Sequence, residues 1–141
     1  MKQISSRFSI AVHTLSLIAT MPNECTGDLI AQSVNTNPVI IRRIMSSLKK
    51  AGLIDVRPGV GGASLLRDPA EVTLLDVYRA LDVVENGQLF NFHKNPNPAC
   101  PVGRMIEHSL RAELDEAQKA MERRLNSVTL QQMMDQVDVS D

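Results

Sequence analysis

The sequence has little that would mark a secreted or membrane protein. Its 141 residues include no tryptophan and only two cysteines, Cys25 and Cys100. Two cysteines are too few for a disulfide scaffold, and a reducing compartment would keep both as thiols. The longest apolar stretches, residues 10–18 and 39–45, contain polar side chains and are far shorter than the roughly 18 to 20 residues of a membrane span. The first residues also lack the apolar run of a signal peptide, so we expect a cytoplasmic protein.

Motifs of common enzymes are missing as well. There is no Gly-rich phosphate loop followed by Lys and Ser or Thr, no nucleophile elbow and no His-Glu-x-x-His. We therefore expect a protein without enzymatic activity. A thiol enzyme that uses Cys100 with His93 or His108 stays open as an alternative.

What the sequence does have is a strong charge asymmetry beneath a net charge of -1. Residues 1–70 hold eight Lys and Arg against four Asp and Glu, a net charge of +4, whereas residues 71–141 hold seven against twelve, a net charge of -5. A basic first half beside an acidic second half indicates a module that binds a polyanion, joined to a part that binds something else or itself. The 43% hydrophobic and 22% charged residues are typical of one compact globular unit.

Three helices are expected in the basic half. Residues 5–20 repeat apolar side chains every three or four positions, and Thr26 can cap a short second helix that runs to Ser33. A third helix should begin after Asn37 as N-cap, with Pro38 at its first position, and stop at Gly52. Its apolar stripe should face the core, and its other face should point outward. The expected inward residues are Ile41, Ile44, Met45 and Leu48, and the expected outward residues are Val39, Arg42, Arg43, Ser46 and Lys49.

The next segment predicts a β-hairpin. Two short strands, residues 53–57 and 63–67, surround a Gly-rich connection, and Thr73 then caps a fourth helix. A hairpin that directly follows a helix-turn-helix is a wing. The fold class we expect is therefore mainly α with a small β-hairpin wing, a winged helix-turn-helix followed by a long C-terminal dimerisation helix.

After the expected winged helix-turn-helix, the sequence predicts a loop and a long helix. Residues 84–100 have no sustained period and form a loop that is a candidate sensor region, because long connections in compact proteins are commonly functional. One apolar stripe then runs along an otherwise charged helix, which cannot bury it alone, so we expect a homodimer. The dimerisation residues expected on this stripe are Ile106, Leu110, Leu114, Ala117 and Met121. A short last helix is expected at residues 129–136, and the predicted domains are 1–83, 84–100 and 101–141.

The chemistry of the basic half suits double-stranded DNA. A major groove admits one α-helix. An arginine side chain donates two hydrogen bonds to guanine or pairs with phosphate, and we expect Arg42 and Arg43 to bind in one of these ways. Arg57 at the base of the wing is placed to reach a minor groove or a phosphate. Taken singly, each of these arginines is explained equally well as a solvated side chain. The glycines of the wing, within residues 59–62, are explained equally well as a simple turn. Together with the charge of the first half, they favour DNA.

Three segments of the sequence also carry a family resemblance: Ser-Arg-Phe-Ser-Ile-Ala-Val-His at 6–13, Asn-Thr-Asn-Pro-Val-Ile-Ile-Arg-Arg at 35–43 and Leu-Lys-Lys-Ala-Gly-Leu at 48–53. The chain resembles the Rrf2 family of bacterial transcription regulators, and the resemblance continues through the wing to residues 77–80. It is most similar to the YwnA-like branch, which shares the Asn-Pro-Asn-Pro-x-Cys-Pro-Val-Gly element at 95–103.

The resemblance implies a sequence-specific regulator, with repression as the expected effect, that binds a pseudo-palindromic operator as a homodimer with crossing long helices. By position, Val39, Arg42 and Arg43 would read bases, Arg57 would enter the minor groove, and the N-terminal residues of the first helix would approach the phosphate backbone. The complete set of expected DNA-binding residues is Ser6, Arg7, Thr36, Asn37, Val39, Arg42, Arg43, Arg57, Gly59 and Gly61.

The sequence departs from the family pattern in the wing and in its cysteines. Residues 57–63 read Arg-Pro-Gly-Val-Gly-Gly-Ala where many members have Arg-Gly-x-Gly-Gly-Gly-Tyr, so the geometry of that loop does not carry over. Iron-sulfur members hold their cluster with three closely spaced cysteines, and only Cys100 is present here. His93 and His108 lie nearby in the sequence, but we expect no cofactor and no metal.

Cys100 stands directly before Pro101 and is a candidate sensor. As the N-cap of the long helix it would lie where the helix dipole favours a thiolate, so one hypothesis is a redox or electrophile switch. The other is a small structural cap without a sensing role. A winged helix that serves only protein contacts is a further alternative to DNA binding.

Overall fold

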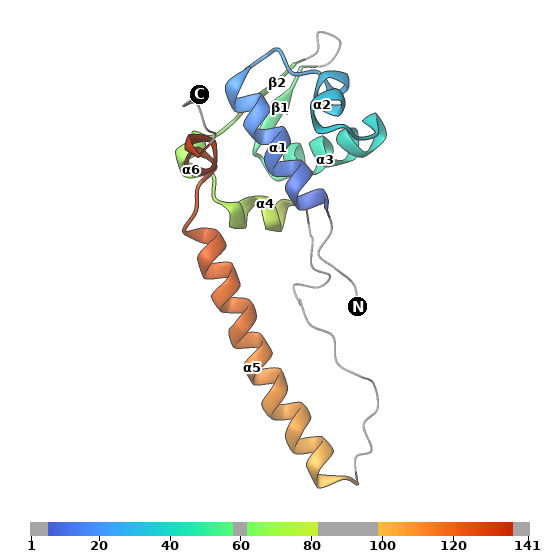
Figure 1. Ribbon diagram of the computed structural model, residues 1–141, viewed down its shortest axis with the longest axis vertical. Coiled ribbons are helices and arrows are strands. Elements are labelled where there is room, and N and C mark those ends of the chain that lie inside the picture. The colour runs from blue at the N-terminus through green and yellow to red at the C-terminus, as the bar shows by residue number, and fades with distance from the viewer. Residues whose placement is uncertain (1–5, 58–61, 82–98, 137–141) are drawn as a thin grey trace.

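The computed structural model describes residues 6–57, 62–81 and 99–136, and Figure 1 shows a head at one end with one long helix leading away from it. The elements in chain order are α1 (Arg7–Thr20), α2 (Gly27–Val34), α3 (Pro38–Lys50), β1 (Ile54–Val56), β2 (Ala63–Leu65), the 3-10 helix η1 (Pro69–Glu71), α4 (Leu74–Ala80), α5 (Pro101–Asn126) and α6 (Leu130–Asp135). The expected fold class, mainly helical with one small hairpin, is confirmed. No helix in the described part of the chain is both long and apolar enough to cross a membrane.

The helices of the head begin and end where local chemistry fixes them. The Thr26 hydroxyl accepts a hydrogen bond from the Leu29 amide at 3.2 Å, and the Asn37 side chain accepts one from the Val39 amide at 2.8 Å. Asn35 adopts a left-handed conformation with a φ of 61°, which turns the chain between α2 and α3. Beyond α3, Gly52 has a φ of +79°, a conformation that glycine tolerates best. The predicted caps of α2 and α3 are confirmed.

The wing is a two-stranded antiparallel hairpin in which Ile54 pairs with Leu65 and Val56 with Ala63. Each strand has three residues, so the five-residue strands expected at 53–57 and 63–67 were too long. Single hydrogen bonds continue the pairing at both ends, from Leu66 to Leu53 and from Arg57 to Gly62, but they do not extend the ladder. The tip, residues 58–61, lies outside the described residues, and the predicted contacts Gly59 and Gly61 lie with it.

The core of the head is made by α1, α2, α3, the hairpin, α4 and the start of α6. The four inward residues predicted for α3 are all buried. Burying one Leu or Ile side chain stabilises a fold by about 1.5 to 3 kcal/mol, so this stripe holds α3 firmly against α1 and α4. Cys25 is also fully buried, and its thiol donates to the Leu17 carbonyl at 3.4 Å. Burial, and after it the charge of Glu24, raises the pKa of the Cys25 thiol, which suits a structural role.

The C-terminal helix returns to this core, which the sequence did not indicate. Leu130 at the start of α6 is fully buried in the core cluster of the head. Thr73 and Thr129 form a β-bridge, and the Leu74 and Leu130 amides donate to Val128 and Val72 at 2.9 and 2.7 Å. Both threonines also close capping boxes at the start of their helices. The domain boundaries predicted from sequence stay a prediction, but residue 130 shares the core of the first domain.

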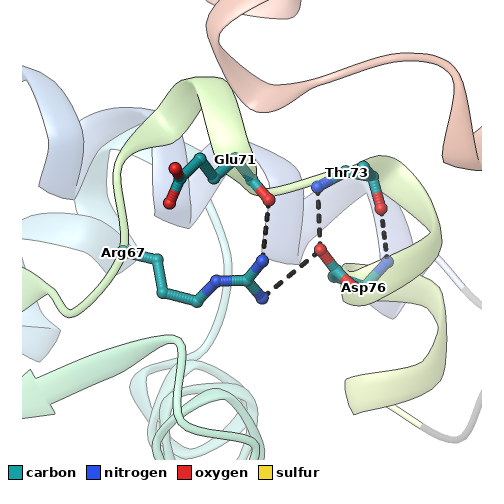
Figure 2. A network of polar contacts seen from close by, with 4 residues as sticks. All are labelled: Arg67, Glu71, Thr73 and Asp76. Atoms are coloured by element: carbon teal, nitrogen blue, oxygen red, sulfur yellow. Dashed lines mark hydrogen bonds and ion pairs between the residues drawn. The ribbon is translucent and has the colours of Figure 1, made fainter.

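A polar network ties the wing to the same place. Figure 2 shows Arg67, which follows the second wing strand, with its guanidinium between the end of η1 and the start of α4. Its guanidinium donates to the Glu71 carbonyl at 2.8 Å and lies 3.5 Å from the Asp76 carboxylate. Asp76 in turn accepts from the Thr73 amide at 3.0 Å and closes the α4 cap. The base of the wing, η1 and α4 are therefore held as one unit.

Only the end of α5 packs on the head within the described chain. Met121 and Leu125 contact Leu75 and Tyr78 of α4. Tyr78 lies edge-on to Phe8 at a centroid distance of 6.5 Å. Burial chiefly raises the pKa of the Tyr78 hydroxyl, with Glu122 adding to this and Arg79 acting against it. From this junction α5 leads away for about 40 Å, its length at 1.5 Å per residue over 26 residues.

Candidate nucleic-acid interface

Helix α3 presents the side chains predicted to read DNA. Ile44 on its inner face is fully buried, whereas Val39 on the outer face is 46% exposed and Arg42 and Arg43 are exposed. No carboxylate among the described residues lies within ion-pair distance of either arginine. The outer start of α3 is therefore a cationic surface on which neither guanidinium pairs with an acidic side chain of the described chain.

The two arginines point to opposite flanks of α3. The Cγ of Arg42 lies 4.0 Å from the position that a Cβ on Gly27 would occupy, so its stem runs beside the start of α2. Arg43 instead lines a hollow of about 430 Å³ between α1 and α3. We call this the α1–α3 hollow, and its described lining is Ser6, Arg7, Ile10, Thr36, Ile40, Arg43 and Ser47. Four residues expected to contact DNA, from three parts of the sequence, thus meet around one depression.

Arg7 is fixed in this place by the backbone of α4. Its guanidinium donates to the Leu81 carbonyl at 3.3 Å, which joins the start of α1 to the end of α4. Ser6 precedes α1 and is exposed, and its carbonyl accepts from the Ser9 hydroxyl at 3.0 Å. The start of α1 is therefore held beside α3, with Ser6 and Arg7 at the rim of the same hollow.

The wing contributes one described residue of the expected set. Arg57 is exposed, and its amide donates to the Gly62 carbonyl at 3.3 Å. Gly62 has a φ of +90°, and a Cβ added there would lie 2.4 Å from the Asn23 carbonyl oxygen. Only glycine lets the base of the wing pass this close to the turn between α1 and α2. This close approach of Gly62 to Asn23 fixes the position of the wing base, and with it the position of Arg57.

A second hollow, of about 500 Å³, lies where α3 and α4 end. We call it the α3–α4 hollow, and its described lining is Arg7, Ser47, Lys50, Ala51, Arg79, Ala80 and Leu81. The sequence analysis missed Lys50 and Arg79 as site residues. Cations in the last turn of a helix are an ordinary sequence feature, because they suit the helix dipole, so nothing in the sequence set these two apart.

Helix α5 carries two predicted features, the Cys100 cap and the apolar stripe expected to form a dimer interface. Cys100 is the N-cap, as expected, and its sulfur accepts from the Gly103 amide at 3.4 Å. Of the expected dimerisation residues, Ile106 and Leu110 are 53% and 46% exposed, Ala117 is exposed and Leu114 is half-buried. Met121 contacts its own α4.

Metal-ligating side chains do not gather in the described part of the chain. Among those residues no group of three or more His, Cys, Asp and Glu is placed to hold a metal ion. His108 is exposed on α5, and His93 lies outside the described residues. Cys100 brings one thiol to the start of α5, and its sulfur is engaged in the helix cap.

Comparisons with known proteins agree with this geometry. The profile of the Rrf2 family, described as iron-dependent transcriptional regulators, matches residues 4–136. YwnA of Bacillus subtilis, a candidate helix-turn-helix transcriptional regulator, is 49% identical over 93% of this chain and 96% of its own. YffB of Lactococcus lactis, with a similar description, is 27% identical over 95% and 88% of the two chains.

Solved structures give the same result. A crystal structure of a candidate DNA-binding protein is 43% identical, covers 92% of this chain and 99% of its own, and superposes with a TM-score of 0.75. The cysteine regulator CymR of B. subtilis has the same fold at 23% identity, with a TM-score of 0.70 over 98% and 100% of the two chains. The family match spans nearly the whole sequence, so the resemblance seen in the sequence is confirmed: this chain belongs to the Rrf2 family of transcriptional regulators.

Proposed function

We propose that the protein is a cytoplasmic repressor that binds a pseudo-palindromic operator in double-stranded DNA as a homodimer. The observation that carries this proposal is the division of α3 into a buried stripe and an outer face with Val39, Arg42 and Arg43 exposed. An α-helix held in this way is free to enter a major groove, where arginine forms bidentate hydrogen bonds with guanine and an apolar side chain contacts the thymine methyl group.

In the proposed complex each part of the surface has a separate task. Val39, Arg42 and Arg43 read base edges, while Ser6 and Arg7 hold a backbone phosphate at the α1–α3 hollow. The cap of α3 supports this arrangement, because Asn37 fixes the first turn from which Val39 projects. Arg57 contacts the neighbouring minor groove or its phosphates, so that the wing adds affinity with less base selectivity.

The exposed apolar start of α5 supports the homodimer. Four large apolar side chains there, Val102, Met105, Ile106 and Leu110, are 46% to 61% exposed. An exposed apolar stripe of this kind marks a protein interface. A second copy of the same helix offers a matching stripe, and a two-fold dimer presents two heads to two half-sites.

The test is selection of bound fragments from random duplexes by the purified protein, followed by binding titrations over a range of salt concentrations. If the dimer neutralises about eight phosphates, log affinity falls against log salt with a slope near -7. Arg42→Ala should cost about 1 to 3 kcal/mol on the selected sequence and flatten the preference among bases. Lys119→Ala removes an exposed cation from α5 and serves as the control.

Two results would contradict the proposal. A protein that retains no duplex at low salt is not a DNA-binding regulator, and one used only for protein contacts would behave in this way. An Arg42→Ala variant that weakens selected and random duplexes equally would show that Arg42 grips phosphate and does not read a base.

The proposed activity uses neither catalysis nor a cofactor. The family description names iron, whereas the proposed DNA contacts use no metal ligand. Aerobically and anaerobically purified protein should therefore bind DNA with equal affinity, provided that Cys100 is reduced in both. Turnover of any electrophile by Cys100 would contradict the non-enzymatic part of the proposal.

A second candidate function, thiol sensing, rests on the position of Cys100. Its sulfur is the acceptor of the helix cap at Gly103, so a change at the sulfur acts directly on the start of α5. A peroxide would transfer one oxygen atom to the sulfur, giving a sulfenic acid and water, and remove the capping acceptor in its present form. A crystal structure of an oxidised CymR from Staphylococcus aureus shows the same fold at 18% identity, with a TM-score of 0.66.

Peroxide treatment followed by DNA titration tests this second function. We expect oxidised wild type to lose affinity for the operator and Cys100→Ser, which keeps a capping oxygen, to be unaffected. Cys25 is buried, so we expect it to stay reduced, and its oxidation would indicate nonspecific damage to the protein. Equal operator affinity before and after oxidation of Cys100 would leave the cysteine with a structural role alone.

A further inference from the structure

The α3–α4 hollow is a cationic depression whose residues Lys50 and Arg79 do not belong to the expected DNA-binding set. Three of its described lining residues are cations: Arg7, Lys50 and Arg79. None of the described lining residues is acidic. Lys50 and Arg79 are exposed, and no carboxylate among the described residues lies within ion-pair distance of either. The hollow opens toward solvent and is large enough, at about 500 Å³, for a phosphodiester group and its neighbouring sugars.

The ends of two helices reduce this positive charge but do not cancel it. Helices α3 and α4 end at Lys50 and Ala80, and each helix C-terminus carries about half a negative charge. Lys50 and Arg79 together carry two full positive charges, which outweigh about one negative charge even when Arg7 is left out of the count. One of the α4 terminal carbonyls, that of Leu81, is already bonded to Arg7. Pairing with the helix ends accounts for part of the cationic cluster and leaves a site that favours an anion.

The place of this hollow argues for a particular anion. It shares Arg7 and Ser47 with the α1–α3 hollow, which Arg43 of the recognition helix lines from the other side. The two hollows are therefore neighbours along α3, the first beside its start and the second at its last turn, and cationic side chains line both. A DNA strand carries a phosphate at every nucleotide, so a strand held at the first hollow continues past the second.

We propose that Lys50 and Arg79 bind a backbone phosphate of the operator, beyond the phosphate held by Ser6 and Arg7. This inference rests on the proposed function, and it adds to it a second backbone anchor formed by the ends of α3 and α4. The anchor contributes affinity and orientation without base selectivity, since a phosphate is the same at every sequence position.

The experiment compares Lys50→Gln/Arg79→Gln with wild type on two probes, the selected duplex and a random-sequence duplex of equal length. Arg7 stays unchanged because its bond to Leu81 is structural. The matched control is Lys119→Gln/Arg123→Gln, which removes the same charge from exposed positions on α5. Sedimentation confirms that all proteins have the same dimer content, and circular dichroism confirms that they are folded.

We expect the double variant to bind both probes about tenfold more weakly, with the ratio between probes unchanged. The slope of log affinity against log salt should become shallower by about 2, one phosphate for each copy in the dimer. Ethylation interference should then show at least one phosphate per half-site whose ethylation weakens wild type but not the double variant. The control variant should match wild type in all three measurements.

Each other outcome overturns the proposal. Wild-type affinity and slope in Lys50→Gln/Arg79→Gln would show that no phosphate lies in the hollow, while the proposed function would stand. A loss confined to the selected duplex would make these residues base readers. A wild type that binds neither probe would remove the proposed function, and this inference with it.

Discussion

Helices α3 and α5 share the same pattern of apolar and charged residues but differ in how far the apolar side is buried. Each carries an apolar stripe along one side and charged residues on the other. The stripe of α3 is buried by α1, α2, α4 and the hairpin, whereas the first half of the α5 stripe is about half exposed. An apolar stripe therefore does not by itself say which surface covers it. In α3 the chain closes its own core, and in α5 the described chain supplies a cover only at Met121 and Leu125.

The sharpest way to break this contrast is Leu110→Ala. If a second copy covers the stripe, each lost side chain costs about 2 kcal/mol, or about 4 kcal/mol in a two-fold dimer, which is roughly a thousandfold in the dimer dissociation constant. Alanine is the best helix former, so loss of helix cannot explain the effect. Analytical ultracentrifugation over a concentration series measures it. Leu66→Ala, which trims an exposed leucine of the head, is the control. Identical dimer constants for both variants would mean that the start of α5 is not the interface.

The matching change in α3 should act on folding. Ile44 is fully buried, so Ile44→Ala is expected to lower the free energy of unfolding by about 3 kcal/mol through the cavity it leaves. Ile40, on the same helix and 38% exposed, should cost less than about 1 kcal/mol when changed to alanine. Urea unfolding at one protein concentration compares the two. Similar losses for both would show that the head does not hold α3 as tightly as its burial indicates.

The approach of the wing to the α1–α2 turn gives a smaller effect. Gly62→Ala should destabilise the head by about 2 kcal/mol, because it adds a contact of 2.4 Å with Asn23 to the strain of a positive φ. Gly52→Ala has the strain without the contact, since nothing lies within 4 Å of its added Cβ, and should cost about 1 kcal/mol. Thermal unfolding of the pair separates the two causes. An equal loss would mean that the wing base moves away from Asn23 at no cost.

The weakest expected effect concerns the capping box at the start of α4. Thr73→Ala removes the hydroxyl that accepts from the Asp76 amide at 3.1 Å and should cost about 1 kcal/mol. Thr73→Ser keeps that oxygen and should retain most of the stability. Chemical denaturation of both variants checks the difference. A serine variant as unstable as the alanine variant would assign the loss to packing of the threonine methyl group.

The local elements could be predicted from the sequence because their signals are local. Asn37, Pro38 and Gly52 mark the bounds of α3, and threonines mark the starts of α2, α4 and α6. The outer face of α3 followed from the same periodicity. These patterns depend on residues within one or two turns, so no knowledge of the rest of the chain was needed.

The features that escaped prediction depend on residues far apart. The burial of Leu130 depends on residues more than 50 positions earlier in the chain, such as Val72, and the hollow with Lys50 and Arg79 needs two helix ends to meet. The split of the α5 stripe needs α4 to contact Met121. A period in the sequence gives the direction of a side chain but not the partner that it meets. The wing was predicted in kind and overestimated in length, because a strand signal does not show where pairing stops.

The return of α6 means that the head is not one continuous stretch of sequence. A fragment cut after Leu81 would have an empty space where Leu130 packs, and a cavity left by a leucine costs about 3 to 5 kcal/mol. Such a loss is comparable with the whole stability of a small domain, so the fragment is expected to be poorly folded. A minimal DNA-binding unit has to join residue 81 to residues 127–136 by a designed linker that bypasses α5. The helix that we propose as the dimerisation arm, α5, is thus an insertion within the sequence of the head.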